Sequence, residues 1–577
     1  MARFRAGGSV RKRVMIAPRL SSSSHLRRLV SLRDRFGGNF ETAKIGHLAV
    51  LEHARLPSAA KVLRLHECLC FMKAYPDSED MLARVDRMLA AFPRRRDLRR
   101  HREALGDTGI AGTDIRFRFF APTAVWLARR WPSKLNLDWN KLSHPERLES
   151  LLPLLVHYAE TPGLDEWDLE LREWIRILRG RRVADGAFLA RRLAALKADS
   201  FVREILYDDL DLPMVLRPGR DTPSRSQARF EGSPVVFLKR GFSRARPILP
   251  RDALRRPVSL RTLGSREATR MIDLAREAMV TRQRDLDIFS YASPADVRRV
   301  DWEDGLQFAC LGAIPERRLL LESVYGFLTL KNGVPIGYVL VSALFGSSEI
   351  AYNVFETFRG GEAGPIYGRV LSTTRTLFGS DAFTIFPYQL GHENEEAIRS
   401  GAWWFYQKIG FRPKSSRARM VMRRELARMR RNPGHRSRPS VLRALAEHNL
   451  YYFLGAPRRD VIGTDFLPNV GLKVSAYLAW RFGSDREEAS RVCSDEAMAL
   501  LGIDSLRGFS AGERLAWERW APLMRILPGL TRWNPSDKRA LLEVIRSKGG
   551  RRESDFALRF DAHRRLRKAI LRLTGWR

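Results

Sequence analysis

The feature that most constrains the fold is a change in the spacing of apolar residues along the chain. From about residue 40 to 210, segments such as SAAKVLRLHECLCFMKAY carry apolar residues at the i, i+3, i+4 and i+7 positions typical of amphipathic helices. Residues 217–234, RPGRDTPSRSQARFEGSP, contain many turn-forming residues and interrupt this pattern. Short β-rich runs follow, and helical spacing returns from residue 430. The pattern therefore predicts an α+β protein in which a mixed α/β region lies between helical regions.

The chain is long enough for several domains, because 577 residues exceed the size at which one hydrophobic core stops growing. Residues 1–33 contain no acidic residue and are rich in Arg and Ser, so we expect a basic, disordered tail on a cytoplasmic protein; an organellar import signal is the weaker alternative. The predicted boundaries are 1–40 for the tail, 41–216 for a helical domain, 217–250 for a linker, 251–427 for the mixed α/β domain and 428–577 for a C-terminal helical region.

The mixed region shows a succession of local patterns. Residues 257–264 predict a strand, and residues 265–283 predict an amphipathic helix. The runs YGFLTLKN and VPIGYVLVSALF meet at Lys331-Asn332-Gly333, which indicates a β-hairpin. The remaining predicted elements are a strand over 348–358, a glycine-rich turn and helix over 359–379, a strand over 381–390 and a helix with a turn over 394–411.

The glycine-rich turn, Arg359-Gly-Gly-Glu-Ala-Gly364, stands where a strand is expected to pass into a helix. Backbone N–H groups at a helix N-terminus attract anions, and glycine lets a pyrophosphate approach the backbone closely. Glu362 would repel such a group unless its carboxylate points into solvent or caps the helix. The alternative interpretation is a turn that only reverses the chain.

A second motif lies 30 residues further on and is rich in aromatic residues. Asn394-Glu-Glu-Ala397 is followed by Tyr406-Gln-Lys-Ile-Gly-Phe411, with Trp403 and Trp404 between them. Aromatic residues at helical spacing usually form the buried face of a helix, so we expect both tryptophans to be packing residues.

The order of elements and the two motifs together resemble the GNAT superfamily of acyl-CoA-dependent N-acyltransferases. The resemblance covers residues 257 to about 425, which is less than a third of the chain. Family members carry Arg/Gln-x-x-Gly-x-Gly/Ala at the turn, and here Glu362 replaces the middle glycine. Twelve positions separate Asn394 from Tyr406, a longer interval than the family usually has.

The resemblance implies a fold, a reaction and a set of site residues. The reaction is transfer of an acyl group, most simply acetyl, from acetyl-CoA or another acyl-CoA to an amine, without a metal. Tyr406 is the implied acid for the leaving thiolate. Asn394 is the implied contact of the pantetheine arm, with Ser400 as its alternative. The other implied cofactor-binding residues are Phe358, Arg359, Gly360, Gly361, Ala363 and Gly364.

The proposed chemistry also needs a base, because a primary amine must lose a proton when it attacks a thioester. Glu349 and Glu356 are the two candidates on the predicted strand 348–358. They are seven positions apart, so on a regular strand they face opposite sides of the sheet and only one of them can serve. A β-bulge would change this conclusion.

The net charge of +37, from 102 Lys and Arg against 65 Asp and Glu, favours a polyanionic partner such as nucleic acid. Basic runs at 423–439 and 563–577 agree with such a partner, although no nucleic-acid-binding motif accompanies them. The alternative function is therefore a catalytically degenerate GNAT-like domain in a protein that binds nucleic acid or another partner.

No run of 18 apolar residues occurs, so we expect no transmembrane segment. The acceptor amine, small molecule or protein, is not indicated.

Overall fold

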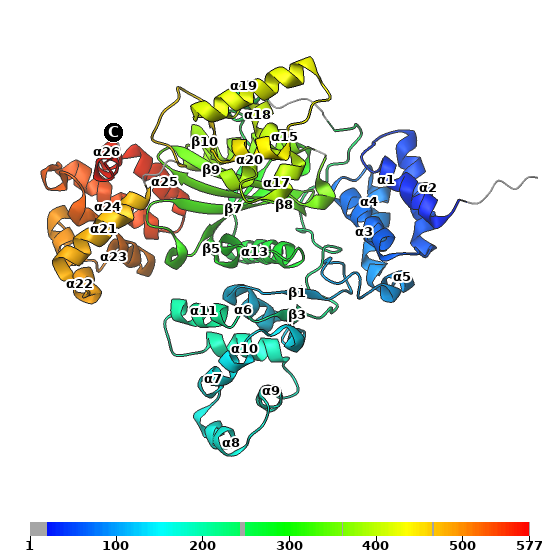
Figure 1. The fold of residues 1–577 in the computed structure, drawn as a ribbon, viewed down its shortest axis with the longest axis horizontal. Coiled ribbons are helices and arrows are strands. Elements are labelled where there is room, and N and C mark those ends of the chain that lie inside the picture. The colour runs from blue at the N-terminus through cyan, green and yellow to red at the C-terminus, as the bar shows by residue number, and fades with distance from the viewer. Residues whose placement is uncertain (1–19, 243–247, 361, 464–466, 576–577) are drawn as a thin grey trace, which may run out of the picture.

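The computed structural model describes residues 20–242, 248–360, 362–463 and 467–575 (Figure 1). It confirms a mixed α+β architecture, in which a large mixed sheet is flanked by helices. None of the helices in these ranges combines the length and the hydropathy that a membrane span requires.

Within the described residues, nine strands form the central sheet, in the order β11-β12-β10-β9-β8-β7-β6-β5-β4. The strands are β4 (Ser259–Thr262), β5 (Ala292–Asp301), β6 (Leu306–Ala313), β7 (Ser323–Lys331), β8 (Val334–Leu344), β9 (Ser347–Val354), β10 (Ala382–Ile385), β11 (Arg412–Pro413) and β12 (Leu450–Phe453). Strands β4 to β9 are antiparallel neighbours in chain order. The predicted hairpin is present, and Asn332 and Gly333 both have positive φ, as its tight turn requires.

The sheet changes character between β9 and β10, which are parallel neighbours. They pair only over Ser347–Glu349 and Ala382–Thr384, whereas β9 stays paired with β8 as far as Val354. Beyond Glu349, one edge of β9 therefore has no strand beside it among the described residues. The crossover between the two strands is α15 (Ala363–Phe378), the helix predicted after the glycine-rich turn.

Helices cover both faces of this sheet (Figure 1). One face carries α15 with α16 (Pro387–Leu390), α17 (Glu395–Ser400), α18 (Ala402–Ile409), α19 (Ser416–Arg431) and α20 (Pro439–Ala446). The opposite face carries α13 (Ser265–Val280), the amphipathic helix predicted from its apolar spacing, followed by the short α14 (Asp287–Ser290). Side chains on one face of β9 therefore point toward the α15 layer, and those on the other face point toward the α13 layer.

The N-terminal helices pack directly against the end of the sheet. They are α1 (Ser22–Leu32), α2 (Asn39–His53), α3 (Ala59–Ala74), α4 (Glu79–Ala91) and α5 (Arg96–Arg100). Their buried side chains belong to the same hydrophobic core as those of the sheet. The second half of the predicted disordered tail is folded, because α1 forms there and buries Leu26 and Leu29. Residues 1–19 lie outside the described residues.

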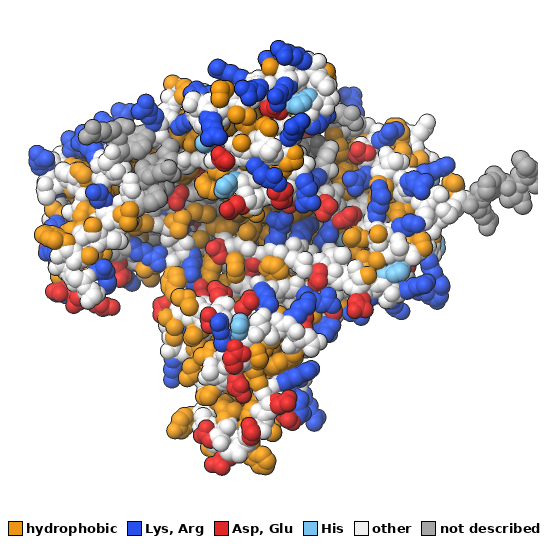
Figure 2. All heavy atoms as spheres, viewed as in Figure 1, with side chains coloured by type: hydrophobic (Ala, Val, Ile, Leu, Met, Phe, Trp, Pro, Cys, Tyr) orange, Lys and Arg blue, Asp and Glu red, His pale blue; other side chains and the backbone are white. Residues whose placement is uncertain are grey.

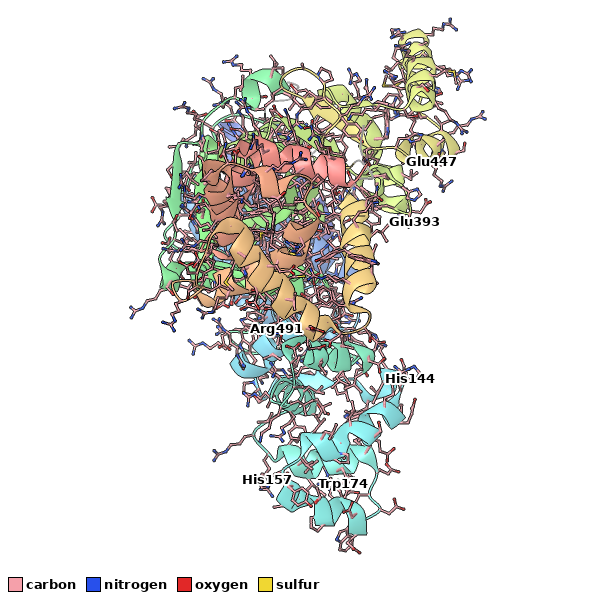
Figure 3. All side chains as sticks on the ribbon, turned by 90° about the vertical axis from the view of Figure 1, so that its left-hand side faces the viewer. His144, His157, Trp174, Glu393, Glu447 and Arg491 are labelled. Atoms are coloured by element: carbon pink, nitrogen blue, oxygen red, sulfur yellow. The ribbon has the colours of Figure 1, made fainter. Side chains whose placement is uncertain are left out.

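Residues 115–216 form a separate unit that projects from the body, with His157 and Trp174 toward its far end (Figure 3). It has its own hydrophobic core. Its helices are α6 (Ala121–Arg130), α7 (Pro145–Leu155), α8 (Thr161–Glu166), α9 (Leu171–Arg179), α10 (Asp185–Ala194) and α11 (Ser200–Asp209). It also contains the short strands β1 (Ile115–Phe117), β2 (Leu135–Leu137) and β3 (Met214–Leu216). The prediction of an all-helical region 41–216 missed these strands, because three residues are too few to show an alternating pattern.

The C-terminal helices form a third core. They are α21 (Leu467–Phe482), α22 (Arg486–Leu501), α23 (Ala511–Ile526), α24 (Pro535–Gly549), α25 (Glu553–Ala562) and α26 (Arg564–Leu573). The capping box of Ser510 and Glu513 begins α23. The predicted boundary at 427/428 is wrong as a structural boundary, because β12 lies in the central sheet.

Candidate functional site

A groove of about 360 Å³ runs along the free edge of β9. We call it the β9 groove, and its lining residues are Tyr352, Asn353, Val354, Arg359, Gly360, Ala363, Gln389, Asn394, Glu396, Ala397, Ser400, Ala402, Phe405 and Tyr406. They come from the end of β9, the start of α15 and the helices α16 to α18. The groove exists because the pairing of β9 with β10 ends at Glu349 and α15 begins beside the space that opens between the two strands.

The start of α15 forms one end of the groove. Gly360 has a φ of 89°, a left-handed conformation that favours glycine, and it lines the groove with Ala363, the first residue of the helix. Gly364 follows as the second residue of α15, and Gly361 lies outside the described residues. The predicted strand-to-helix turn is therefore present, with a helix N-terminus at the groove.

The carboxylate of Glu362 takes neither of the two orientations expected from the sequence. It makes no hydrogen bond that caps α15. Instead it forms a 2.8 Å ion pair with the Nζ atom of Lys331, and the two side chains are only 15% and 1% exposed. Lys331 comes from the β7–β8 hairpin and also lies over the ring of Tyr75 in the N-terminal helices. The negative charge beside the helix N-terminus is therefore compensated.

Arg359 lies across the mouth of the groove. Its Nε atom donates a hydrogen bond to the carbonyl oxygen of Val354 at 3.2 Å, and its Nη2 atom lies 2.5 Å from Glu396 Oε1. Both charged side chains are substantially exposed. This ion pair joins the turn after β9 to α17, and both residues also line a second cavity described below.

Three tyrosines form the aromatic wall beside the groove. The rings of Tyr352 and Tyr406 each lie 5.5 Å from the ring of Tyr367 on α15. Burial raises the pKa of each of the three phenols above its ordinary value, so they stay protonated at neutral pH. The buried hydroxyl oxygens of Tyr352 and Tyr367 have no hydrogen-bond partner among the described residues. Tyr406 is thus a neutral hydroxyl donor on the groove wall.

The long interval between Asn394 and Tyr406 contains an extra helix. Asn394 caps α17, accepting a hydrogen bond from the Ala397 N–H at 3.1 Å, and α17 ends just before Gly401, whose φ is 68°. The chain then restarts as α18, which carries Tyr406. Asn394 and Ser400 both line the groove. The side-chain oxygen of Asn394 serves this cap, a role that the motif comparison did not predict.

The aromatic stretch that precedes Tyr406 is mostly packing. Trp403 is fully buried and Trp404 is 7% exposed, as expected for a packed helix face. Phe358, which the resemblance assigns to the cofactor, is also buried; its ring stacks on Phe71 of α3 at 6.4 Å. Phe358 therefore contributes to the core and does not line the β9 groove.

The two candidate bases lie in different places. Glu349 occupies the last position where β9 pairs with β10, opposite Thr384. Burial, with a further contribution from Glu322, raises the pKa of Glu349 to about 7. Glu356 lies beyond the end of β9, in a turn over Glu356–Phe358, so the argument from strand alternation does not apply to it. The β8–β9 pairing contains no bulge in its described register.

A second cavity, of about 410 Å³, adjoins the groove. We call it the arginine pocket, and its lining residues are Glu67, Asp107, Thr108, Arg225, Thr281, Arg282, Arg284, Asn353, Phe355, Glu356, Thr357, Arg359 and Glu396. They come from α3, the loop after α5, the segment 217–234, the end of α13 and the end of β9. In Figure 2 this side of the molecule is hollowed between the helices over the sheet and the α13 layer, and Lys or Arg side chains lie in the hollow.

Of the residues that line this pocket, Arg359 and Glu356 follow from the sequence motifs, whereas Arg225, Arg282 and Arg284 do not. Arg225 lies in the segment predicted to be a linker, yet it is mostly buried and is paired with Glu67 at 3.2 Å. Its guanidinium also donates to the Thr108 carbonyl and to Thr357 Oγ1. The segment is thus part of the site, and a breaker-rich composition carries no indication of that.

Comparisons of the chain with protein-family models, with curated proteins and with solved structures found no significant match.

Proposed function

We propose that the protein is an acyl-CoA-dependent N-acyltransferase that binds its acyl-CoA in the β9 groove. The observation that carries this proposal is the separation of the parallel strands β9 and β10 beside the N-terminus of α15. The separation leaves a free strand edge, and the helix adds an anion-attracting end to the same groove. A long ligand with amide groups and a pyrophosphate matches this combination.

The helix end suits the pyrophosphate in charge and in shape. Backbone N–H groups in the first turn of α15 have no partner within the helix, and Gly360 leaves open space where a side chain would stand. The adjacent carboxylate of Glu362 is held by Lys331 at 2.8 Å. The substitution that departs from the family motif therefore does not by itself exclude an anion.

The strand edge suits the pantetheine arm, which carries two amide groups. Among the described residues, 350–354 of β9 pair with a strand on the β8 side only. On the open side the Val354 carbonyl accepts a hydrogen bond from Arg359, and the other outward N–H and C=O groups can bond with the amides of a ligand. Extended chains add to exposed strand edges in this way. Asn353 Oδ1 and the Tyr352 hydroxyl, neither of which has a hydrogen-bond partner among the described residues, lie on the same stretch and offer further polar contacts.

In the proposed reaction the amine nitrogen attacks the thioester carbonyl carbon, the C–S bond breaks, and an amide and a thiol form. The amine passes one proton to a base, and the departing sulfur takes one proton from an acid. Tyr406 is the proposed acid, because its neutral hydroxyl lines the groove. Glu349 and Glu356 remain the two candidate bases.

The first experiment is calorimetric titration with acetyl-CoA and with desulfo-CoA, which keeps the nucleotide and pantetheine but cannot donate an acyl group. We expect saturable binding of both at one site. The informative variant is Ala363→Asp, since an acidic residue in the first turn favours the helix but repels a pyrophosphate. We expect it to weaken binding of both ligands at least about tenfold without lowering stability.

The matched control is Ala363→Asn, which has nearly the same shape and no charge. It should bind both ligands far more tightly than Ala363→Asp. Equal binding by the two variants would contradict an anion at this helix end. If the wild-type protein binds neither ligand, the acyltransferase proposal is wrong.

Polyanion binding is the second candidate function, and α19 is the observation that favours it. Its exposed arginines, with no ion pair among the described residues, are Arg417, Arg419, Arg423, Arg424, Arg430 and Arg431. A basic helix face of this kind contacts phosphates through charge alone. The test is binding of RNA and DNA at several salt concentrations. Affinity that falls steeply with salt, and less steeply after three of these arginines are changed to Gln, would support it.

A further inference from the structure

The arginine pocket and the β9 groove are neighbouring parts of one recess. They share Asn353 at the end of β9, together with the Arg359–Glu396 ion pair. The pocket extends toward the end of α13, which covers the face of the sheet opposite α15. A molecule in the pocket therefore reaches the groove from the opposite side of β9.

Most charges in the pocket already have partners. Glu67 is paired with Arg225 at 3.2 Å, Asp107 with Arg116 at 3.3 Å, and Glu396 with Arg359 at 2.5 Å. These pairs fix the pocket walls and contribute little net charge.

Two arginines of the pocket differ, because neither Arg282 nor Arg284 forms an ion pair anywhere in the described part of the chain. Arg282 lies over the ring of Phe355, 3.7 Å from its centroid, and its described hydrogen bonds run only from Nη1, to the Ala278 carbonyl and Thr281 Oγ1. Its Nε and Nη2 atoms remain available to a ligand. Arg284 donates one hydrogen bond, to the Tyr338 hydroxyl at 2.9 Å.

Guanidinium groups that have no acidic partner here lower the stability of the folded protein unless a bound anion neutralises them. Burial, with repulsion from Arg225, lowers the pKa of Arg282 well below its ordinary value, so the site disfavours the charge that it holds. An anion in contact with both guanidinium groups would remove that penalty, and guanidinium groups match carboxylate and phosphate oxygens in geometry. The free carboxylate of the pocket is Glu356, which is exposed and forms no ion pair with a described residue.

We propose that the arginine pocket binds a small acceptor amine that also carries an anionic group, carboxylate or phosphate, which Arg282 and Arg284 hold. Glu356 then faces the ammonium end of the same molecule. This inference rests on the proposed acyltransferase function and names the class of its acceptor.

The test compares acceptors that differ only in the anionic group: glycine and glutamate against their α-amides, and phosphoethanolamine against ethanolamine. Release of the CoA thiol from acetyl-CoA measures the reaction. We expect at least one anionic acceptor to exceed its neutral partner about 10-fold to 100-fold in kcat/KM, the effect of hydrogen bonds to a charged group. The carboxylate and phosphate pairs show which anion the pocket prefers.

The variants Arg282→Gln and Arg284→Gln should each reduce this preference at least about tenfold, mainly through KM, and Arg282→Lys should restore part of it. The matched control is Arg266→Gln, an exposed arginine at the other end of α13 with no described ion pair. It should leave the preference unchanged. Thermal unfolding of each variant separates loss of recognition from loss of fold.

Direct titration distinguishes failure of this inference from failure of the proposed function. If desulfo-CoA binds but no anionic amine binds or reacts better than its neutral partner, the acceptor assignment is overturned and the function stands. If desulfo-CoA does not bind, the proposed acyltransferase function is wrong. The assignment of an acceptor to the arginine pocket is then wrong as well, whatever the pocket binds.

Discussion

The β9 groove and the arginine pocket lie side by side, yet they are built in different ways. The groove is formed by a strand edge, a helix N-terminus and aromatic rings that all come from residues 352–406. The pocket is formed by charged side chains from segments as far apart as α3 and the end of β9. The groove offers a strand edge and a helix end, and the pocket offers charged side chains. Substitutions of the pocket side chains therefore leave the backbone of the groove unchanged.

The largest expected effect concerns the ion pair that supports the groove side of this comparison. Lys331→Met leaves the mostly buried Glu362 carboxylate without its partner, so we expect the free energy of unfolding to fall by about 3 kcal/mol. Urea denaturation measures this change. The control is the double variant Lys331→Met/Glu362→Gln, which should recover most of the loss. A double variant no more stable than the single one would show that the ion pair is not the cause.

A second prediction separates chemistry from binding within the groove. Tyr406→Phe removes only the hydroxyl, so we expect kcat to fall about 100-fold while the affinity for desulfo-CoA stays the same. Steady-state kinetics and calorimetry measure the two quantities. An unchanged kcat would remove Tyr406 as the acid and leave protonation of the thiolate to water.

A third prediction decides which of the two carboxylates is the base; Glu356 lines the arginine pocket, whereas Glu349 lines neither the groove nor the pocket. If Glu349 is the base, kcat/KM rises about tenfold per pH unit below pH 7 and levels off above it, because the pKa of this carboxyl is about 7. Glu349→Gln should abolish this dependence, and Glu356→Gln should preserve it. The reverse result would place the base in the arginine pocket.

The same carboxyl makes a prediction about stability. Its pKa is higher in the folded protein than in the unfolded chain, so the folded state binds the proton more tightly. The free energy of unfolding should therefore fall as pH rises from about 4.3, the unfolded pKa, to about 7. Glu349→Gln should flatten this part of the curve. Urea midpoints across this pH range test the sign.

The smallest expected effect concerns the tyrosine that does not line the groove. The buried hydroxyl of Tyr367 has no hydrogen-bond partner among the described residues. Tyr367→Phe should therefore change the free energy of unfolding by no more than about 0.5 kcal/mol, or stabilise slightly. It also serves as the control for Tyr406→Phe, and a loss of activity as large as for Tyr406 would contradict the assignment of roles.

The two regions also differ in how far the sequence predicts them. The hairpin at Asn332-Gly333, helix α13 and the turn before α15 follow from local residue patterns, and all are present. The groove residues Arg359, Gly360, Asn394 and Tyr406 come from two contiguous motifs, so a motif comparison could name them together.

Other parts depended on contacts that no local pattern reveals. β5 was not predicted, because Pro294 and a shift of register interrupt its alternation. Arg282 and Arg284 follow a helix as ordinary basic residues, and only the fold brings them to Arg225 and Glu356. The Lys331 partner of Glu362 was missed for the same reason, since 31 positions separate them.

The position of β12 between β10 and β11 has a consequence for biosynthesis. β11 leaves the ribosome first, but within the described residues it pairs only with β12, which is made after the whole of α19 and α20. Chains are extended at about 5–20 residues per second, so β11 and the preceding α18 are synthesised several seconds before β12. The ring of Phe411, just before β11, lies 5.5 Å from that of Tyr452 on β12, so this packing forms only after β12 is made. A nascent chain therefore completes this edge of the sheet late, when most of the protein has already been translated.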